Sequence, residues 1–171
     1  WLKQAQAVLA RTSNRFDRVK ADGDLAWVYL DLGALDNALS YFSDSAAQAA
    51  EIGDSLDQIT STNGAAEILL RQHKYLAAAE QSRRALELAR KSGNAAWEID
   101  SFDALAAGAL ELKNWDGAQR YNQESRSISE RLNRKKDLVN NREVDARIAV
   151  GRKQYGESER LFEGVLASDD A

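Results

Sequence analysis

Residues 55–94, SLDQITSTNGAAEILLRQHKYLAAAEQSRRALELARKSGN, decide the fold of this chain. A shift of 40 residues in either direction brings back the same types of residue without an insertion. The matching columns are Val19, Ile59, Ile99 and Val139; Ala26, Ala66, Ala106 and Ala146; Leu30, Leu70, Leu110 and Val150; Leu35, Tyr75, Trp115 and Tyr155; and Ala38, Ala78, Ala118 and Ser158. A fixed period of this size is typical of stacked supersecondary units. The sequence therefore predicts a repeat array.

The pattern inside the quoted unit is helical. Ile59, Ala66 and Leu70 are spaced as the buried stripe of one helix requires. A polar break at 71–74 separates it from a second apolar stripe that begins at Tyr75. Gly93 suits the left-handed residue after a helix, and residue 94 is a good cap for the next one. Each unit is predicted to be a hairpin of two antiparallel helices.

The hairpins are predicted to follow one another without a linker. We expect one all-α solenoid over residues 1–171, with full repeats at 15–54, 55–94, 95–134 and 135–171. Residues 1–14 match the second helix of a truncated repeat. The chain contains no methionine, so we expect it to be an excised piece of a larger protein.

Two places depart from the apolar pattern. The second helix of the third hairpin carries Asn122, Ser125 and Arg126 where other repeats mostly carry apolar or small residues. Asp145, in the fourth hairpin, also stands where an apolar residue is expected. The fourth hairpin is therefore the weakest match to the repeat.

The repeat resembles the tetratricopeptide repeat, whose signature contains W-x2-L-G-x2-Y followed by A-x3-F. Leu25-Ala26-x2-Tyr29 and Ala38-x3-Phe42 carry the resemblance in the first hairpin. The longer period and the missing proline are similar to the 40-residue repeats of kinesin light chains, of bacterial transcriptional activators with helical sensor domains, and of bacterial CHAT-domain peptidases. The resemblance implies a right-handed superhelix whose first helices line a concave face that binds partners.

Composition and motifs argue against several classes of function. A net charge of −4 argues against nucleic-acid binding, and no apolar run is long enough to span a membrane. With no cysteine and no signal peptide, we expect a cytoplasmic protein. The single histidine, His73, is predicted to be an exposed turn residue without a nucleophile beside it. We expect no enzyme activity, no cofactor and no metal site.

The resemblance also implies which positions line the groove. In repeat register they carry seven acids and three bases, while the rest of the chain is balanced. The predicted partner-binding residues are Lys20, Asp24, Trp27, Asp31, Asn63, Glu67, Arg71, Asp100, Asp103, Glu111, Asn140, Glu143 and Arg147. A concave surface of one sign attracts the opposite sign. We therefore expect a protein or peptide segment that carries Lys or Arg, with Trp27 as an aromatic anchor.

Several alternatives remain open at this stage. The acids could simply keep an exposed face soluble. The Lys, Asn and Arg clamp that some members of the family use for acidic C-termini is absent, since its positions carry Gly23, Trp27, Gly64, Asp100 and Ala104. The chain could instead be the regulatory or sensor arm of a multidomain bacterial protein, because residues 146–162 are similar to the last repeats of CHAT-domain peptidases. End-to-end self-association is a further possibility.

Overall fold

The computed structural model describes residues 14–169 and contains eight α-helices in that range. The predicted helix within 1–14 lies outside the described residues, apart from residue 14 at its end. The helices are α2 (Arg15–Asp31), α3 (Leu35–Ile52), α4 (Ser55–Arg71), α5 (Tyr75–Ser92), α6 (Ala95–Glu111), α7 (Trp115–Arg131), α8 (Lys135–Gly151) and α9 (Tyr155–Asp169). The all-α repeat fold is confirmed.

Every turn between helices contains one residue with positive φ. Gly53 and Gly93 close α3 and α5 in the left-handed conformation, as predicted. The corresponding residue after α7 is Asn133, at φ 53°. The tight turns within the hairpins use the same conformation at Gly33 but also at His73, Lys113 and Lys153. His73 is therefore an exposed turn residue, as predicted.

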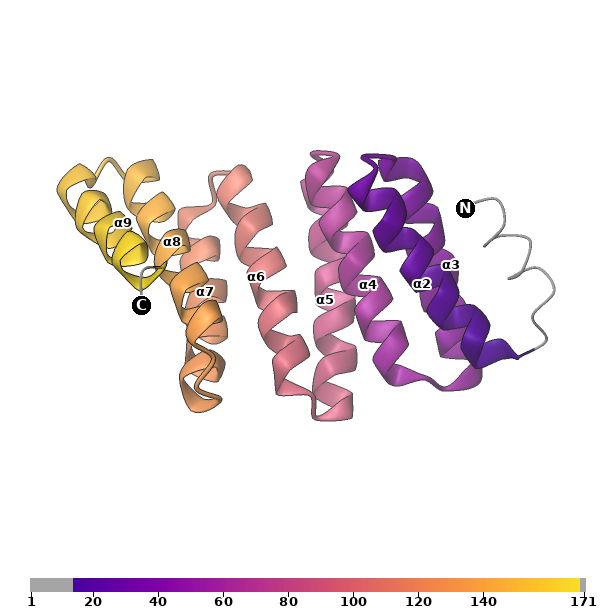
Figure 1. Ribbon diagram of the computed structural model, residues 1–171. Coiled ribbons are helices and arrows are strands. Elements are labelled where there is room, and N and C mark those ends of the chain that lie inside the picture. The colour runs from indigo at the N-terminus through magenta and orange to yellow at the C-terminus, as the bar shows by residue number, and fades with distance from the viewer. Residues whose placement is uncertain (1–13, 170–171) are drawn as a thin grey trace.

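The hairpins stand side by side in a row, with the α2 end and the α9 end far apart (Figure 1). Each helix packs against the helices before and after it in sequence. In addition, α2 contacts α4, α4 contacts α6 and α6 contacts α8, whereas the second helices make no such contacts with each other. The first helices are thus closer together than the second helices. The row therefore curves with α2, α4, α6 and α8 on its inner, concave side.

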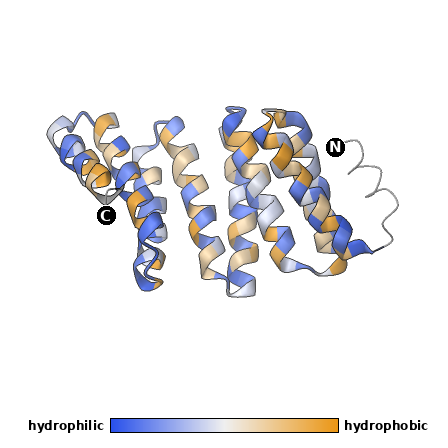
Figure 2. Ribbon diagram, in the orientation of Figure 1, coloured by the Kyte–Doolittle hydropathy of each residue, from blue (hydrophilic) through white to orange (hydrophobic). Residues whose placement is uncertain are grey.

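The helices bury one stripe each. Hydrophobic and hydrophilic segments alternate along them (Figure 2), as expected for helices that pack on one side and meet water on the other. Within 14–169, no helix combines the length and the apolar character needed to cross a bilayer.

The alanine column contributes one residue to each of α2, α4, α6 and α8. Ala26, Ala66, Ala106 and Ala146 have no exposed surface. A methyl side chain at these positions allows close helix packing. The column is therefore part of the buried core of the described hairpins.

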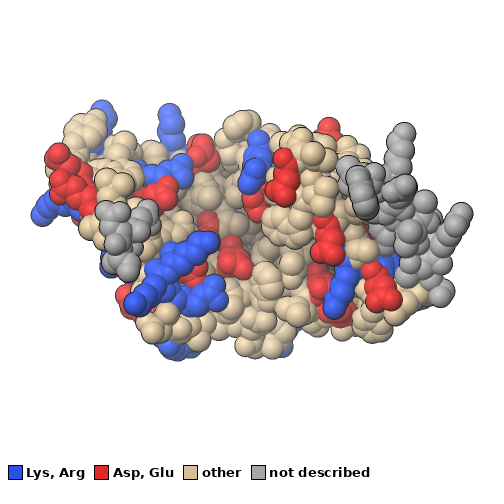
Figure 3. All heavy atoms as spheres, in the orientation of Figure 1, with Lys and Arg blue, Asp and Glu red and all other residues tan. Residues whose placement is uncertain are grey.

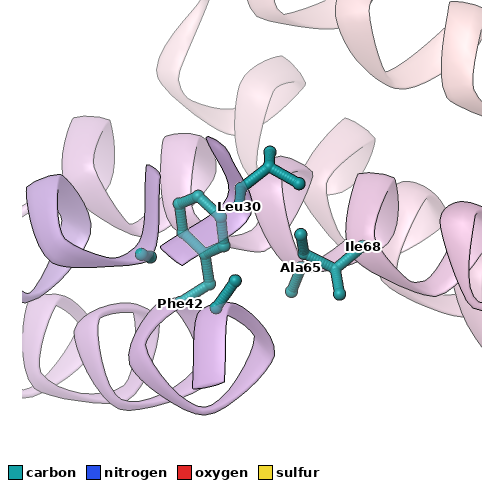
Figure 4. Close-up of a cluster of buried hydrophobic side chains, with 6 residues drawn as sticks. Leu30, Phe42, Ala65 and Ile68 are labelled. Carbon is teal, nitrogen blue, oxygen red and sulfur yellow. The ribbon is translucent and has the colours of Figure 1, made fainter. Parts of the chain in front are cut away.

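The junction between α3 and α4 is mainly apolar, with one buried hydrogen bond between the Ser45 and Ser61 hydroxyls at 2.8 Å. Phe42 is fully buried and packs with Leu30, Ala65 and Ile68 (Figure 4). A Cβ added at Gly64 would lie 2.6 Å from the Phe42 ring, so the ring rests directly on the backbone of α4. Glycine is needed here because any side chain would displace the ring.

The junction between α7 and α8 is polar. Asn122 is fully buried, and its Nδ2 donates to the Asn141 carbonyl at 2.9 Å and to Asp145 Oδ1 at 2.6 Å. Asn141 Nδ2 donates in return to Asn122 Oδ1 at 2.9 Å. Arg126 forms an ion pair with Asp145. The two departures from the apolar pattern are therefore partners of each other.

Candidate functional site

The concave side contains a cavity of about 530 Å³ between α2, α4, α6 and α8. Acidic side chains gather in the hollow at the middle of this face (Figure 3). The floor consists of small or aliphatic residues, and the charged residues surround it. The lining residues are Trp27, Thr60, Asn63, Gly64, Glu67, Leu70, Trp97, Asp100, Asp103, Ala104, Ala107, Leu110, Asn140, Glu143, Val144 and Arg147.

Most of the predicted groove residues meet at this cavity. Those that line it are Trp27, Asn63, Glu67, Asp100, Asp103, Asn140, Glu143 and Arg147. Lys20 and Asp24 line a smaller neighbouring cavity of about 240 Å³, which shares Trp27 with the first one. Asp31, Arg71 and Glu111 line neither cavity.

Two of the bases on this face are already paired with acids. Arg71 contacts Glu67 at 2.8 Å one turn along α4, and Arg147 of α8 contacts Glu111 of α6 at 2.9 Å. Each of these pairs is half exposed and is worth less than about 1 kcal/mol. They neutralise one acid each and leave the negative charge of the cavity on Asp100, Asp103 and Glu143.

Asp103 is held at the centre of the cavity by two hydrogen bonds. Ser125 Oγ donates to its Oδ1 at 2.6 Å, and Asn140 Nδ2 donates to its Oδ2 at 2.9 Å. Burial raises the pKa of Asp103 to about 6, and the nearby Asp100 and Asp137 carboxylates add to the rise. The hydrogen bonds from Ser125 and Asn140 oppose it. Asp103 is therefore a carboxylate at neutral pH that gains a proton in mildly acidic solution.

Asp100 lies one turn before Asp103 on α6 and has no hydrogen-bond or ion-pair partner among residues 14–169. Burial raises its pKa, the neighbouring Asp137 carboxylate raises it further, and Arg134 lowers it. A cation from a partner would relieve the repulsion between Asp100 and Asp137.

Two tryptophans lie at the cavity. Trp27 is 40% exposed, and its ring meets Phe42 edge-on with centroids 5.0 Å apart, so the apolar junction below fixes its orientation. Trp97 also lines the cavity, although the sequence analysis did not include it among the groove residues. It lies three residues before Asp100 on α6. This places it one helical turn before the first column of predicted groove residues. Extending the predicted columns by one helical turn would have found it.

The amide of Asn63 is only partly satisfied. Its Oδ1 accepts from Ser101 Oγ at 3.1 Å, while its Nδ2 is buried without a partner in the described part of the chain. Residues 14–169 contain no group of three or more His, Cys, Asp or Glu side chains placed to hold a metal ion.

Comparison with known proteins agrees with the fold. Residues 17–91, which span α2 to α5 almost completely, match the model of the tetratricopeptide repeat. This part of the chain belongs to the tetratricopeptide repeat family. Tetratricopeptide repeats mediate protein–protein interactions. No curated protein sequence matches the chain.

Two solved structures extend the likeness to the remaining hairpins. BtubC (BKLC) from P. vanneervenii is 16% identical, with a TM-score of 0.82 over 99% of this chain and 73% of that one. The nearly identical TPR-like repeats assigned to a kinesin light chain of Podosopora anserina are 19% identical, with a TM-score of 0.73 over 98% of this chain and 83% of that one. At such identities the similarity concerns the fold, which is a tetratricopeptide-like solenoid throughout the described hairpins.

Proposed function

We propose that this tetratricopeptide array is a protein-interaction scaffold whose concave groove binds a partner segment carrying Lys or Arg. The observation that supports this most strongly is the cavity between the first helices, which is lined by the acids Glu67, Asp100, Asp103 and Glu143 and by one base, Arg147. A groove of one sign focuses the potential and raises the local concentration of the opposite charge. Catalysis has no part in this role.

The lining favours a peptide over a small charged ligand. The floor contains Leu70, Leu110 and Val144, which offer apolar surface to a side chain that follows or precedes a basic residue. Trp27 offers a large, half-exposed ring, and tryptophan is enriched at binding hot spots. Apolar contacts at the floor and charges at the rim are the usual division in protein interfaces.

The test is a titration of the chain with basic, neutral and acidic peptides of equal length, at low and at high ionic strength. The basic peptide should bind at low salt, and its affinity should fall as salt screens the groove. Glu143→Gln should weaken the interaction, whereas Glu87→Gln, which removes an exposed charge from α5, should not. Equal binding of the three peptides, or tighter binding of the acidic one, would refute the proposal.

A second proposal concerns self-association through the α9 end. Residues 42, 82 and 122 are fully buried under the helix of the next hairpin, whereas Phe162, at the same register position, is 36% exposed. Leu166, one turn further, is 68% exposed. Sedimentation should show association that increases with concentration and that Leu166→Glu abolishes. A monomer at all concentrations would refute this proposal.

A further inference from the structure

We infer that the groove recognises arginine in preference to lysine, with the guanidinium lying against the Trp97 ring and paired with Asp100. The inference rests on the proposed function, since it names the residue of the basic segment that the groove selects. It adds a specificity that charge attraction alone does not give.

Helix α6 places the two residues side by side. Trp97 and Asp100 are three residues apart, so they are neighbours on one face of the helix, and both line the cavity. Ala104 continues the same stripe one turn further and leaves the floor open beside them. A planar cation lying on the ring therefore has a carboxylate within reach at its edge.

Three of the other four charged groups of the lining are already engaged, and the fourth, Glu143, lies on α8 rather than on the helix of Trp97. Both oxygens of Asp103 accept hydrogen bonds from Ser125 and Asn140, and Glu67 is paired with Arg71. Asp100 has no such partner among residues 14–169, and it lies directly beside a ring. The cation is thus expected at Asp100 first.

A related arrangement, in which the carboxylate lies four residues before the ring, is formed elsewhere on α6 by the chain itself. The Arg90 guanidinium carbon lies 5.5 Å from the centre of the Phe102 ring. Its Nε contacts Glu98 Oε2 at 3.4 Å, and Glu98 precedes Phe102 by one helical turn. An arginine held by a ring and a carboxylate one turn apart is therefore compatible with the geometry of this helix. Trp97 and Asp100 offer the same combination in the groove.

The preference for arginine follows from the chemistry of the two cations. The guanidinium is planar, stacks on aromatic rings, forms paired hydrogen bonds with a carboxylate, and is weakly hydrated. The lysine ammonium is strongly hydrated and would lose water against the apolar floor around Ala104 and Leu110. Cation–π contacts are strongest with tryptophan and gain strength when they are partly desolvated.

The experiment compares oligoarginine and oligolysine peptides of equal length by calorimetry at one ionic strength. The arginine peptide should bind about tenfold more tightly, which corresponds to one stacked and paired guanidinium. Trp97→Leu should remove most of this difference by weakening only the arginine peptide. Trp97→Phe, which keeps a ring, should retain most of it. Asp100→Asn should weaken both peptides.

Tyr155→Leu is the matched control, because Tyr155 is an exposed ring on α9 outside the groove. It should leave both affinities unchanged. If both peptides bind equally and Trp97→Leu has no selective effect, the arginine preference is refuted while the acidic groove stands. If the preference exists but survives Trp97→Leu, its assignment to Trp97 is refuted. If neither peptide binds, the proposed function itself is refuted.

Discussion

The α3–α4 and α7–α8 junctions occupy equivalent places in the repeat but are built from opposite chemistry. At one register position the first carries Phe42, which presses on the backbone at Gly64. The second carries Asn122, which is equally buried but bonded to Asn141 and Asp145. The same curve of the solenoid is thus compatible with an aromatic contact or with a buried hydrogen-bonded network.

The difference matters for the groove because each junction supports one side of it. Phe42 contacts the ring of Trp27 at the α2 end of the cavity. Ser125, part of the polar network, bonds to both Asn141 and Asp103. Packing therefore positions the aromatic wall, whereas hydrogen bonds position the acidic one. Substitutions at the two junctions should therefore differ in their effects on stability and on its dependence on pH and salt.

Replacing Phe42 by Ala should have the largest effect. It empties a fully buried ring site and should lower the free energy of unfolding by about 3–5 kcal/mol. Phe162→Ala, in the same register position but 36% exposed, is the control and should cost about 1 kcal/mol or less. Chemical denaturation measures both. Equal losses would mean that the next hairpin does not bury this position.

Replacing Asn122 by Ala should have the next largest effect. It leaves groups of Asn141 and Asp145 buried with fewer partners, which should cost about 1–3 kcal/mol. Ser82 has the same register position, but its hydroxyl bonds only to the Ala78 carbonyl of its own helix. Ser82→Ala should therefore change stability by about 0.5 kcal/mol or less. If Asn122→Ala and Ser82→Ala lose the same amount of stability, the polar network does not support this junction.

Asp103 should make stability depend on pH. Because its pKa is raised from the ordinary 3.8 to about 6, the folded state binds the proton more tightly than the unfolded state. The contribution of Asp103 therefore lowers the free energy of unfolding as pH rises from about 4 to about 6. Asp103→Asn should remove this slope in urea titrations at several pH values.

The Ser125→Ala variant tests the cause of this pH dependence. The hydrogen bond from Ser125 lowers the pKa of Asp103, so its loss should raise the folded-state pKa and extend the slope to higher pH. If Asp103→Asn and Ser125→Ala both leave the slope of stability against pH unchanged, another titrating group dominates the pH dependence. The affinity of the groove for a basic peptide should fall as the pH is lowered through the same range, because Asp103 then loses its charge.

Salt should have the smallest effect and should act on one junction only. The Arg126–Asp145 pair is partly exposed, so high salt should reduce its coupling energy by less than about 1 kcal/mol. A double-mutant cycle with Arg126→Met and Asp145→Asn measures this energy at low and high salt. The corresponding cycle for Trp27 and Phe42 should not respond to salt. A salt response at both junctions would contradict the contrast drawn between them.

The period and the helix bounds could be predicted because the columns recur without an insertion, and Gly53, Gly93 and Asn133 end helices by their backbone preference. The positive φ of His73, Lys113 and Lys153 could not be predicted, since those residues rarely adopt it unless the fold imposes it. Asn122 and Asp145 each looked like an exception, because their pairing spans two hairpins.

The groove was predicted as a set of columns, but not as a shape. Register alone does not reveal that Arg71 and Arg147 are engaged by acids, because this depends on side-chain geometry. Register also does not place Trp97 at the cavity, because the predicted groove columns begin one helical turn after this residue on α6.

The most direct test of an acidic binding groove is an NMR titration of the isotopically labelled chain with an oligoarginine peptide at low salt. The account predicts that the shifted backbone amides cluster on α4, α6 and α8 around Asp100, and that the effect fades as salt is added. Shifts confined to α3, α5, α7 and α9, or no shifts at any peptide concentration, would contradict it.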